Sequence, residues 1–209
     1  MSRNERIKTI VAVFINLIVF VLEVICLIYF ITHSISGENR FIYYTNISNL
    51  SVGVLSLVNI VLLTRSLVKN EVFSNHIFSI VKFAILNMVT LTFFTVLFFL
   101  MPMTSIQEMY SNNKFITHLV APLLTMSSYL FLEEKSLFKW RYSLFALVPP
   151  IIYSFIYVIC VVFVKCWPDI YQINTKGLWY VIEIITAIFA FGLSQGFYFL
   201  KKLLIKSRQ

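Results

Sequence analysis

Residues 9–32, TIVAVFINLIVFVLEVICLIYFIT, decide the fold of this chain. A helix needs about 20 mainly apolar residues to cross a bilayer, and this run is longer and holds a single charged residue, Glu23. Three basic residues precede it, as they would precede a secretory signal, but no small-x-small cleavage site follows. We therefore expect a retained first membrane span.

The rest of the chain repeats this pattern. Hydrophobic residues make up 59% of the 209 positions and charged residues 12%, and the mean hydropathy is +0.86, whereas soluble domains carry about 25% charged residues. Six apolar stretches are long enough to cross a membrane, at about 9–32, 41–64, 77–101, 115–132, 142–164 and 178–200. Because these runs are continuous and do not alternate, they predict helices and not barrel strands. The sequence thus predicts an all-α polytopic protein, a single six-helix transmembrane domain over residues 1–209.

The basic residues between the spans predict the orientation. One side of the predicted topology carries Arg3, Arg6, Lys8, Arg65, Lys69, Lys135, Lys139, Arg141, Lys201, Lys202, Lys206 and Arg208. The other side carries Arg40, Lys114, Lys165 and Lys176. Because cytoplasmic loops are enriched in Lys and Arg, both termini are expected in the cytoplasm.

The charge and cysteine content exclude several classes. The net charge of +8 lies in short clusters between spans, without the basic stripe that nucleic-acid binding needs, so we expect no nucleic-acid partner. Three cysteines, Cys26, Cys160 and Cys166, form no Cys-x-x-Cys pair and are interpreted as small apolar fillers. We expect no metal and no cofactor. The usage of Ile, Phe, Lys and Asn suggests an AT-rich genome, and hence a bacterial plasma membrane.

Polar side chains inside the spans are the candidates for function, because they are costly in lipid. Counting 1.5 Å per residue from the outer ends places Glu23, Thr45, His118 and Glu183 at similar depths, about 6–14 Å below the outer surface. They come from four different spans and form one layer in the outer half of the bilayer. Ser48 and Asn49 lie one turn beyond Thr45.

Such a layer could support nucleophilic catalysis. A threonine hydroxyl needs a base within hydrogen-bond reach, and His118 offers one if the second and fourth spans are neighbours. Ser48 or Asn49 could donate to a developing oxyanion, and Glu183 or Glu23 could orient the imidazole. The sequence contains no Gly-x-Ser-x-Gly, His-Glu-x-x-His or phosphate-loop motif, which excludes the common soluble hydrolases, zinc proteases and nucleotide-binding enzymes.

Each residue also has a structural interpretation. Thr45 could bond its own helix backbone, and Ser48 and Asn49 could join helices. Gly192 and Gly196 form a Gly-x-x-x-Gly pair, which predicts a close helix contact. The tyrosines near the span ends, together with Trp167 and Trp179, are interpreted as interfacial anchors.

The segment FIYYTNISNL at residues 41–50 resembles the Tyr-x-Thr-x-x-Ser-Asn stretch of the androgen-induced and androgen-dependent-TFPI-regulating membrane proteins, and is closer to their bacterial six-span relatives. His118-Leu-Val-Ala-Pro122 resembles the His-x-x-x-Pro of those relatives, and Pro150-Ile-Ile-Tyr153 is similar to their Pro-x-x-Tyr. The animal members are intramembrane hydrolases of fatty-acid esters of hydroxy fatty acids. The resemblance implies that Thr45 is the nucleophile and His118 the base.

Two departures from this family stand out. The animal histidine has a different spacing from its following proline, and the acidic residues of the first and sixth spans have no counterpart that we can place. The main expectation is therefore a threonine-dependent hydrolase of a membrane lipid or fatty-acid ester. The alternatives are a small proton-coupled transporter or channel, in which the intramembrane Glu and His would carry protons, and a non-catalytic accessory protein whose polar layer only joins helices.

Overall fold

The computed structural model describes residues 1–32, 42–103, 105, 107, 111, 113–132, 139–174 and 177–206. Within these ranges the chain is helical almost throughout and contains no strand, as the sequence predicts. Phe41, where the second span was expected to begin, lies outside these ranges, and so do four basic residues of the charge count, Arg40, Lys135, Lys176 and Arg208.

The helical elements of the described residues follow one another along the chain, with η marking a π-helical turn. They are α1 (Arg3–Thr32), α2 (Tyr44–Lys69), α3 (His76–Thr95), η2 (Val96–Leu100), α4 (Met101–Met103), η3 (Ile116–Val120), α6 (Ala121–Ser127), η4 (Ser128–Leu132), α7 (Tyr142–Phe145), α8 (Val148–Val158), η5 (Ile159–Phe163) and α9 (Trp179–Lys206).

Five helical segments of the described chain are long and apolar enough to cross a membrane. They are Arg3–Thr32, Tyr44–Lys69, His76–Leu100, Tyr142–Phe163 and Trp179–Ile205, and Ile116–Leu132 is a shorter apolar helix. Large apolar side chains point outward along them, such as Phe14 at 62% exposure and Phe155 at 68%. Such a surface suits lipid and not water, and the chain is a multi-pass membrane protein.

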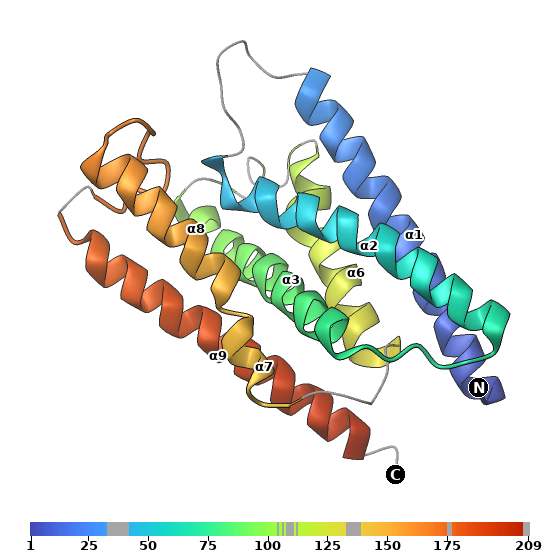
Figure 1. The fold of residues 1–209 in the computed structure, drawn as a ribbon. Helices are drawn as coiled ribbons and strands as arrows, with labels where there is room; N and C mark the ends of the chain where they lie inside the picture. The colour runs from blue at the N-terminus through green and yellow to red at the C-terminus, as the bar shows by residue number, and fades with distance from the viewer. Residues whose placement is uncertain are drawn as a thin grey trace.

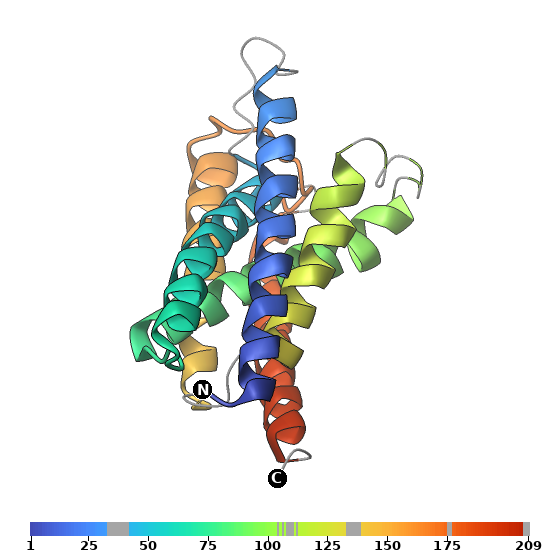
Figure 2. The ribbon, with the colours of Figure 1, turned by 90° about the vertical axis from the view of Figure 1, so that its right-hand side faces the viewer.

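Helix α3 occupies the middle of the bundle (Figure 1). It packs against α2 and α6 on one side and against α7, α8 and α9 on the other, while α1 lies along α2 and α6. Val19, Val52 and Val89 form a shared core of α1, α2 and α3. The start of α1 and the end of α9 lie at the same end of the bundle in both views (Figures 1 and 2). We call the opposite end the outer end.

Local residue chemistry sets the helix boundaries. Asn70 ends α2 in the left-handed conformation with φ 54°, which asparagine tolerates better than most residues. Asn75 begins α3, where its side-chain oxygen accepts the N–H of Phe78 at 3.0 Å. Pro149 and Pro150 stand in the first turn of α8, where a missing N–H costs nothing. The caps at Asn70 and Asn75 therefore leave only a short connection between α2 and α3.

Lys201 joins α9 to the end of the fourth apolar helix. It is only 4% exposed, and its Nζ donates to the carbonyl of Tyr129 at 2.5 Å and to that of Leu130 at 3.5 Å. The ammonium also lies 4.9 Å from the centre of the Tyr129 ring. A cation is favourable at a helix C-terminus because it neutralises the unbonded carbonyls there.

The expected close contact at Gly192 and Gly196 does not form within the described part of the chain. Both glycines are exposed on α9, and a Cβ built on either would meet no atom within 4 Å. The close approach occurs instead at Gly53 of α2, where a Cβ would lie 3.1 Å from the Cβ of Glu23. Small residues allow membrane helices to approach closely, and here the helix pair is α1 and α2.

Candidate functional site

His118 lies in the π-helical turn η3, where the fourth apolar segment begins. Pro122 follows four residues later and has no N–H to bond the His118 carbonyl in the usual way. The helix opens into a wider turn, in which the N–H of Ala121 bonds the carbonyl of Ile116, five residues back. Single π-helical turns of this kind are frequent at functional sites. The His-x-x-x-Pro spacing therefore widens the helix around His118.

The η3 turn packs against α1, α2 and α3, so His118 lies at a junction of four helical segments. Its Nδ1 is buried and has no hydrogen-bond partner among the described residues. The same is true of Glu23 Oε1 on α1, of both amide atoms of Asn49 on α2, and of Thr90 Oγ1 on α3. We call Glu23, Asn49, Thr90 and His118 the outer polar layer. Buried polar atoms are nearly always paired, so an unpaired group needs an explanation such as catalysis or ligand binding.

Helix α1 covers α2 at Gly53, and Thr45 lies on the same side of α2. Thr45, Asn49 and Gly53 are spaced four residues apart and so share one side of the helix. Glu23 lies directly against Gly53. Thr45 is half-buried and stands about two turns farther toward the outer end. The sequence-predicted nucleophile thus belongs to the same helix face as Asn49.

The two oxyanion candidates differ in their hydrogen bonds. Ser48 is fully buried, and its Oγ lies 2.9 Å from the Thr45 carbonyl and 2.9 Å from Thr92 Oγ1. A hydroxyl carries one proton, so Ser48 has none left for a ligand. Asn49 is 3% exposed and keeps its amide N–H donors unpaired among the described residues. Of the two, Asn49 is the available donor.

The two carboxylates belong to different parts of the bundle. Glu23 is 6% exposed on α1, which packs directly on η3. Glu183 is half-buried on α9, near Ser154 of α8. Glu23 therefore lies on a helix that contacts the segment of His118, whereas Glu183 lies on α9, which packs against α8.

Thr45 and His118 lie on neighbouring elements, because η3 packs against α2. No hydrogen bond joins their side chains in the described structure. Contact between the two elements is the first requirement of a hydroxyl–imidazole pair, and the pair itself stays a prediction. Catalytic hydrogen bonds are often long without substrate and shorten when it binds.

Four tyrosines, Tyr44, Tyr153, Tyr157 and Tyr171, form a network at the outer end. The N–H of Tyr44, in the first turn of α2, donates to the Tyr171 hydroxyl at 3.0 Å, and the Tyr153 hydroxyl donates to the Ile42 carbonyl at 2.6 Å. The rings of Tyr44 and Tyr153 are 4.9 Å apart between centroids, and those of Tyr157 and Tyr171 are 5.2 Å apart. This network attaches the start of α2 to α8 and to the loop that follows η5.

The interpretation of these tyrosines as interfacial anchors is wrong for this group. Tyr44 and Tyr157 are buried and the other two half-buried, because the loop after η5 folds back over the start of α2. Burial raises the pKa of the Tyr171 phenol, so this loop hydroxyl keeps its proton. The Pro150-x-x-Tyr153 motif was the one sequence signal for this network.

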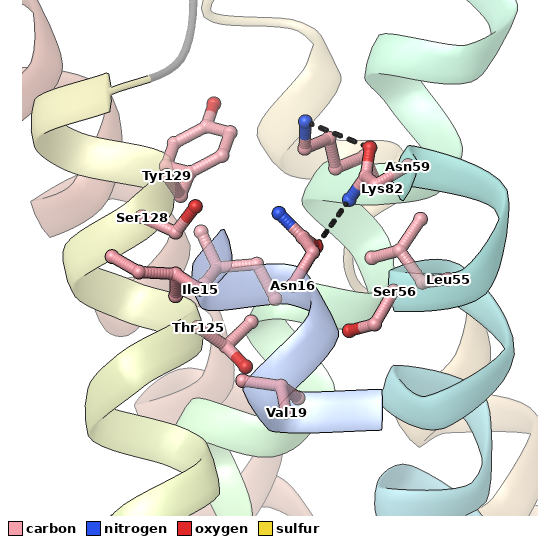
Figure 3. A pocket seen from close by; sticks show the side chains of 11 residues that line it. Ile15, Asn16, Val19, Leu55, Ser56, Asn59, Lys82, Thr125, Ser128 and Tyr129 are labelled. Atoms are coloured by element: carbon pink, nitrogen blue, oxygen red, sulfur yellow. Dashed lines mark hydrogen bonds between the residues drawn. The ribbon is translucent and has the colours of Figure 1, made fainter. Parts of the chain in front are cut away.

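A second polar group lies nearer the termini, around a small cavity with room for about one water molecule (Figure 3). Here Lys82 Nζ donates to Asn59 Oδ1 at 3.2 Å, Asn59 Nδ2 donates to Asn16 Oδ1 at 3.0 Å, and Asn16 Nδ2 donates to the Ala12 carbonyl at 2.8 Å. We call Asn16, Asn59 and Lys82 the inner polar layer. Ser56, Thr125 and Ser128 complete the polar part of the cavity wall. Sequence reasoning did not single out these residues.

Among the described residues, no group of three or more His, Cys, Asp or Glu side chains could hold a metal ion. Comparison with protein-family models, curated proteins and solved structures finds no match for this chain. The arrangement of the outer polar layer is therefore the basis on which a function can be argued.

Proposed function

We propose that the chain is an intramembrane hydrolase of a lipid or fatty-acid ester, with Thr45 as nucleophile and His118 as general base. The observation that carries this proposal is the unpaired, buried state of His118 Nδ1 and of the Asn49 amide on two helical segments that pack together. A buried group without a hydrogen bond costs about 1–3 kcal/mol, and a bound ester could recover that cost. The resemblance of residues 41–50 and 118–122 to the animal hydrolases points the same way.

In the proposed reaction His118 removes the Thr45 hydroxyl proton as the oxygen attacks the ester carbonyl. The Asn49 amide donates to the oxyanion of the tetrahedral intermediate. The intermediate collapses to an acyl-threonine as His118 protonates the leaving alcohol. A water molecule, deprotonated by His118, then releases the fatty acid and restores the hydroxyl.

The proposed membrane arrangement has six crossings, with Ile116–Leu132 as the fourth, and both termini in the cytoplasm. The excess of Lys and Arg on the side of the termini supports this orientation. The start of α1 and the end of α9 lie at the same end of the bundle, as an even number of crossings requires. The outer polar layer would then lie in the extracytoplasmic leaflet of a bacterial plasma membrane.

Labelling by a lipid-like fluorophosphonate tests the activity. Thr45→Ala should abolish labelling because it removes the oxygen that reacts with the probe. His118→Ala should lower the rate at least about 100-fold, to background, because general-base catalysis contributes about 10²–10⁴-fold. Thr45→Ser, which keeps a hydroxyl, should retain labelling. The measurement is in-gel fluorescence on membranes with equal amounts of each variant.

Matched controls come from the same chain. Thr125 donates to the carbonyl of Ala121 at 2.8 Å, and His76 bonds the Tyr142 hydroxyl at 2.9 Å, so neither belongs to the proposed site. Thr125→Ala and His76→Ala should label like the parent chain. Labelling that persists in both Thr45→Ala and His118→Ala would remove the hydrolase assignment.

A further inference from the structure

Cys160 and Cys166 lie where the chain leaves η5 at the outer end. The N–H of Cys166 donates to the carbonyl of Cys160 at 2.9 Å, and the N–H of Trp167 donates to the same oxygen at 3.3 Å. With standard bond lengths, the first of these bonds keeps the two Cα atoms within about 7 Å. Disulfides join Cα atoms about 4.4–6.8 Å apart. The backbone reversal depends on Lys165, which adopts φ 58°.

The two thiols differ in their exposure. Cys166 is exposed and Cys160 is half-buried, so a reagent reaches the first more readily than the second. The third cysteine, Cys26, is buried on α1 with its Sγ 3.9 Å from the Asn113 carbonyl, in a different part of the bundle.

We propose that Cys160 and Cys166 form a reversible disulfide that fastens the loop after η5 to η5 itself. The oxidant is a disulfide compound. The Cys166 thiolate attacks one of its sulfurs, a mixed disulfide forms, and the first thiolate of the oxidant leaves. The Cys160 thiolate then attacks the Cys166 sulfur and displaces the second thiolate. Two protein thiols lose two protons and two electrons, and the oxidant becomes two thiols.

The disulfide would hold a loop that already contacts the start of α2. Within this loop the Asp169 carboxylate accepts the N–H groups of Ile173 at 2.9 Å and Asn174 at 2.8 Å. The hydroxyl of Tyr171, in the same loop, accepts the N–H of Tyr44 at the start of α2. Oxidation would therefore fasten η5 to a loop that is already hydrogen-bonded to α2. The proposed topology puts the pair on the extracytoplasmic side, where disulfides persist. The inference does not depend on the hydrolase activity.

Thiol counting on the full chain in its membrane tests the pair, with Cys26→Ala as the background so that no other cysteine reacts. Membranes are treated with oxidised glutathione, free thiols are blocked with N-ethylmaleimide, and half of each sample is then reduced and labelled with maleimide-polyethylene glycol. The expected result is no label without reduction and two labels after it. The intact mass before reduction should be lower by two hydrogens than that of the reduced chain.

The single variants Cys160→Ser and Cys166→Ser are the matched controls, and neither can form the intramolecular bond. Before blocking, each should show at most one thiol, and neither should give the two-label pattern. Two blocked thiols in the Cys26→Ala chain after oxidation would overturn the proposal. So would a glutathione adduct on Cys166 alone, or a bond between two chains on a non-reducing gel.

Discussion

The outer and inner polar layers occupy opposite halves of the same helices, and they differ in whether their buried polar atoms have hydrogen-bond partners. In the inner layer Lys82, Asn59 and Asn16 bond in sequence and end on the Ala12 carbonyl. In the outer layer Asn49 and His118 bury polar atoms without a partner in the described structure. Polar side chains that bond one another hold helices together, whereas buried polar atoms without a partner can still bond another molecule. The presence or absence of hydrogen-bond partners therefore distinguishes the two layers.

The largest expected effect is the loss of labelling when Asn49 of the outer polar layer is changed. Asn49→Leu removes the proposed oxyanion donor and should lower the fluorophosphonate labelling rate about 100-fold, the effect of losing one such donor. Because the amide has no partner to lose among the described residues, the thermal unfolding temperature should stay the same or rise. A variant that labels normally but unfolds earlier would show that Asn49 is structural, and the contrast between the layers would fail.

The converse change acts on the inner layer. Asn59→Leu removes its bonds to Asn16 and Lys82 and should lower the free energy of unfolding by about 1–2 kcal/mol, since interhelical hydrogen bonds in membranes average about 0.6 kcal/mol and reach about 1.7. Chemical denaturation in detergent measures this loss. The labelling rate per folded molecule should not change. A large fall in labelling would move the inner layer into the site.

The smallest expected effect is that of Ser48→Ala, which tests whether Ser48 or Asn49 is the oxyanion donor. Ser48→Ala removes the bond to Thr92 and should cost about 0.6 kcal/mol of unfolding free energy. Because the Ser48 proton is already used, the labelling rate should match the parent chain. A fall as large as that of Asn49→Leu would identify Ser48 as the donor. The two variants differ by one position on the same helix and so control for each other.

The helical segments could be predicted from the sequence because the bilayer fixes their length. The predicted first and fourth spans fall on helical stretches of the described residues, Arg3–Thr32 and Ile116–Leu132, and the orientation of the termini stays a prediction. Helix ends such as Asn70 and Asn75 follow from local backbone chemistry.

The partners of the polar residues could not be predicted, because they depend on how each helix is rotated about its axis. Ser48 bonds Thr92, and Glu183 lies by Ser154, and neither partner has a signal in sequence spacing. The tyrosine network was missed for a related reason, since a tyrosine near a span end has the same local pattern whether it faces lipid or a folded-back loop.

The contact made by Lys201 also bears on the order in which the bundle is made. Helix α9 follows every other helix in the chain, yet its ammonium supplies the donor for the carbonyls of Tyr129 and Leu130. Because synthesis reaches residue 201 after both of these residues, the two carbonyls gain this donor only once α9 has been made.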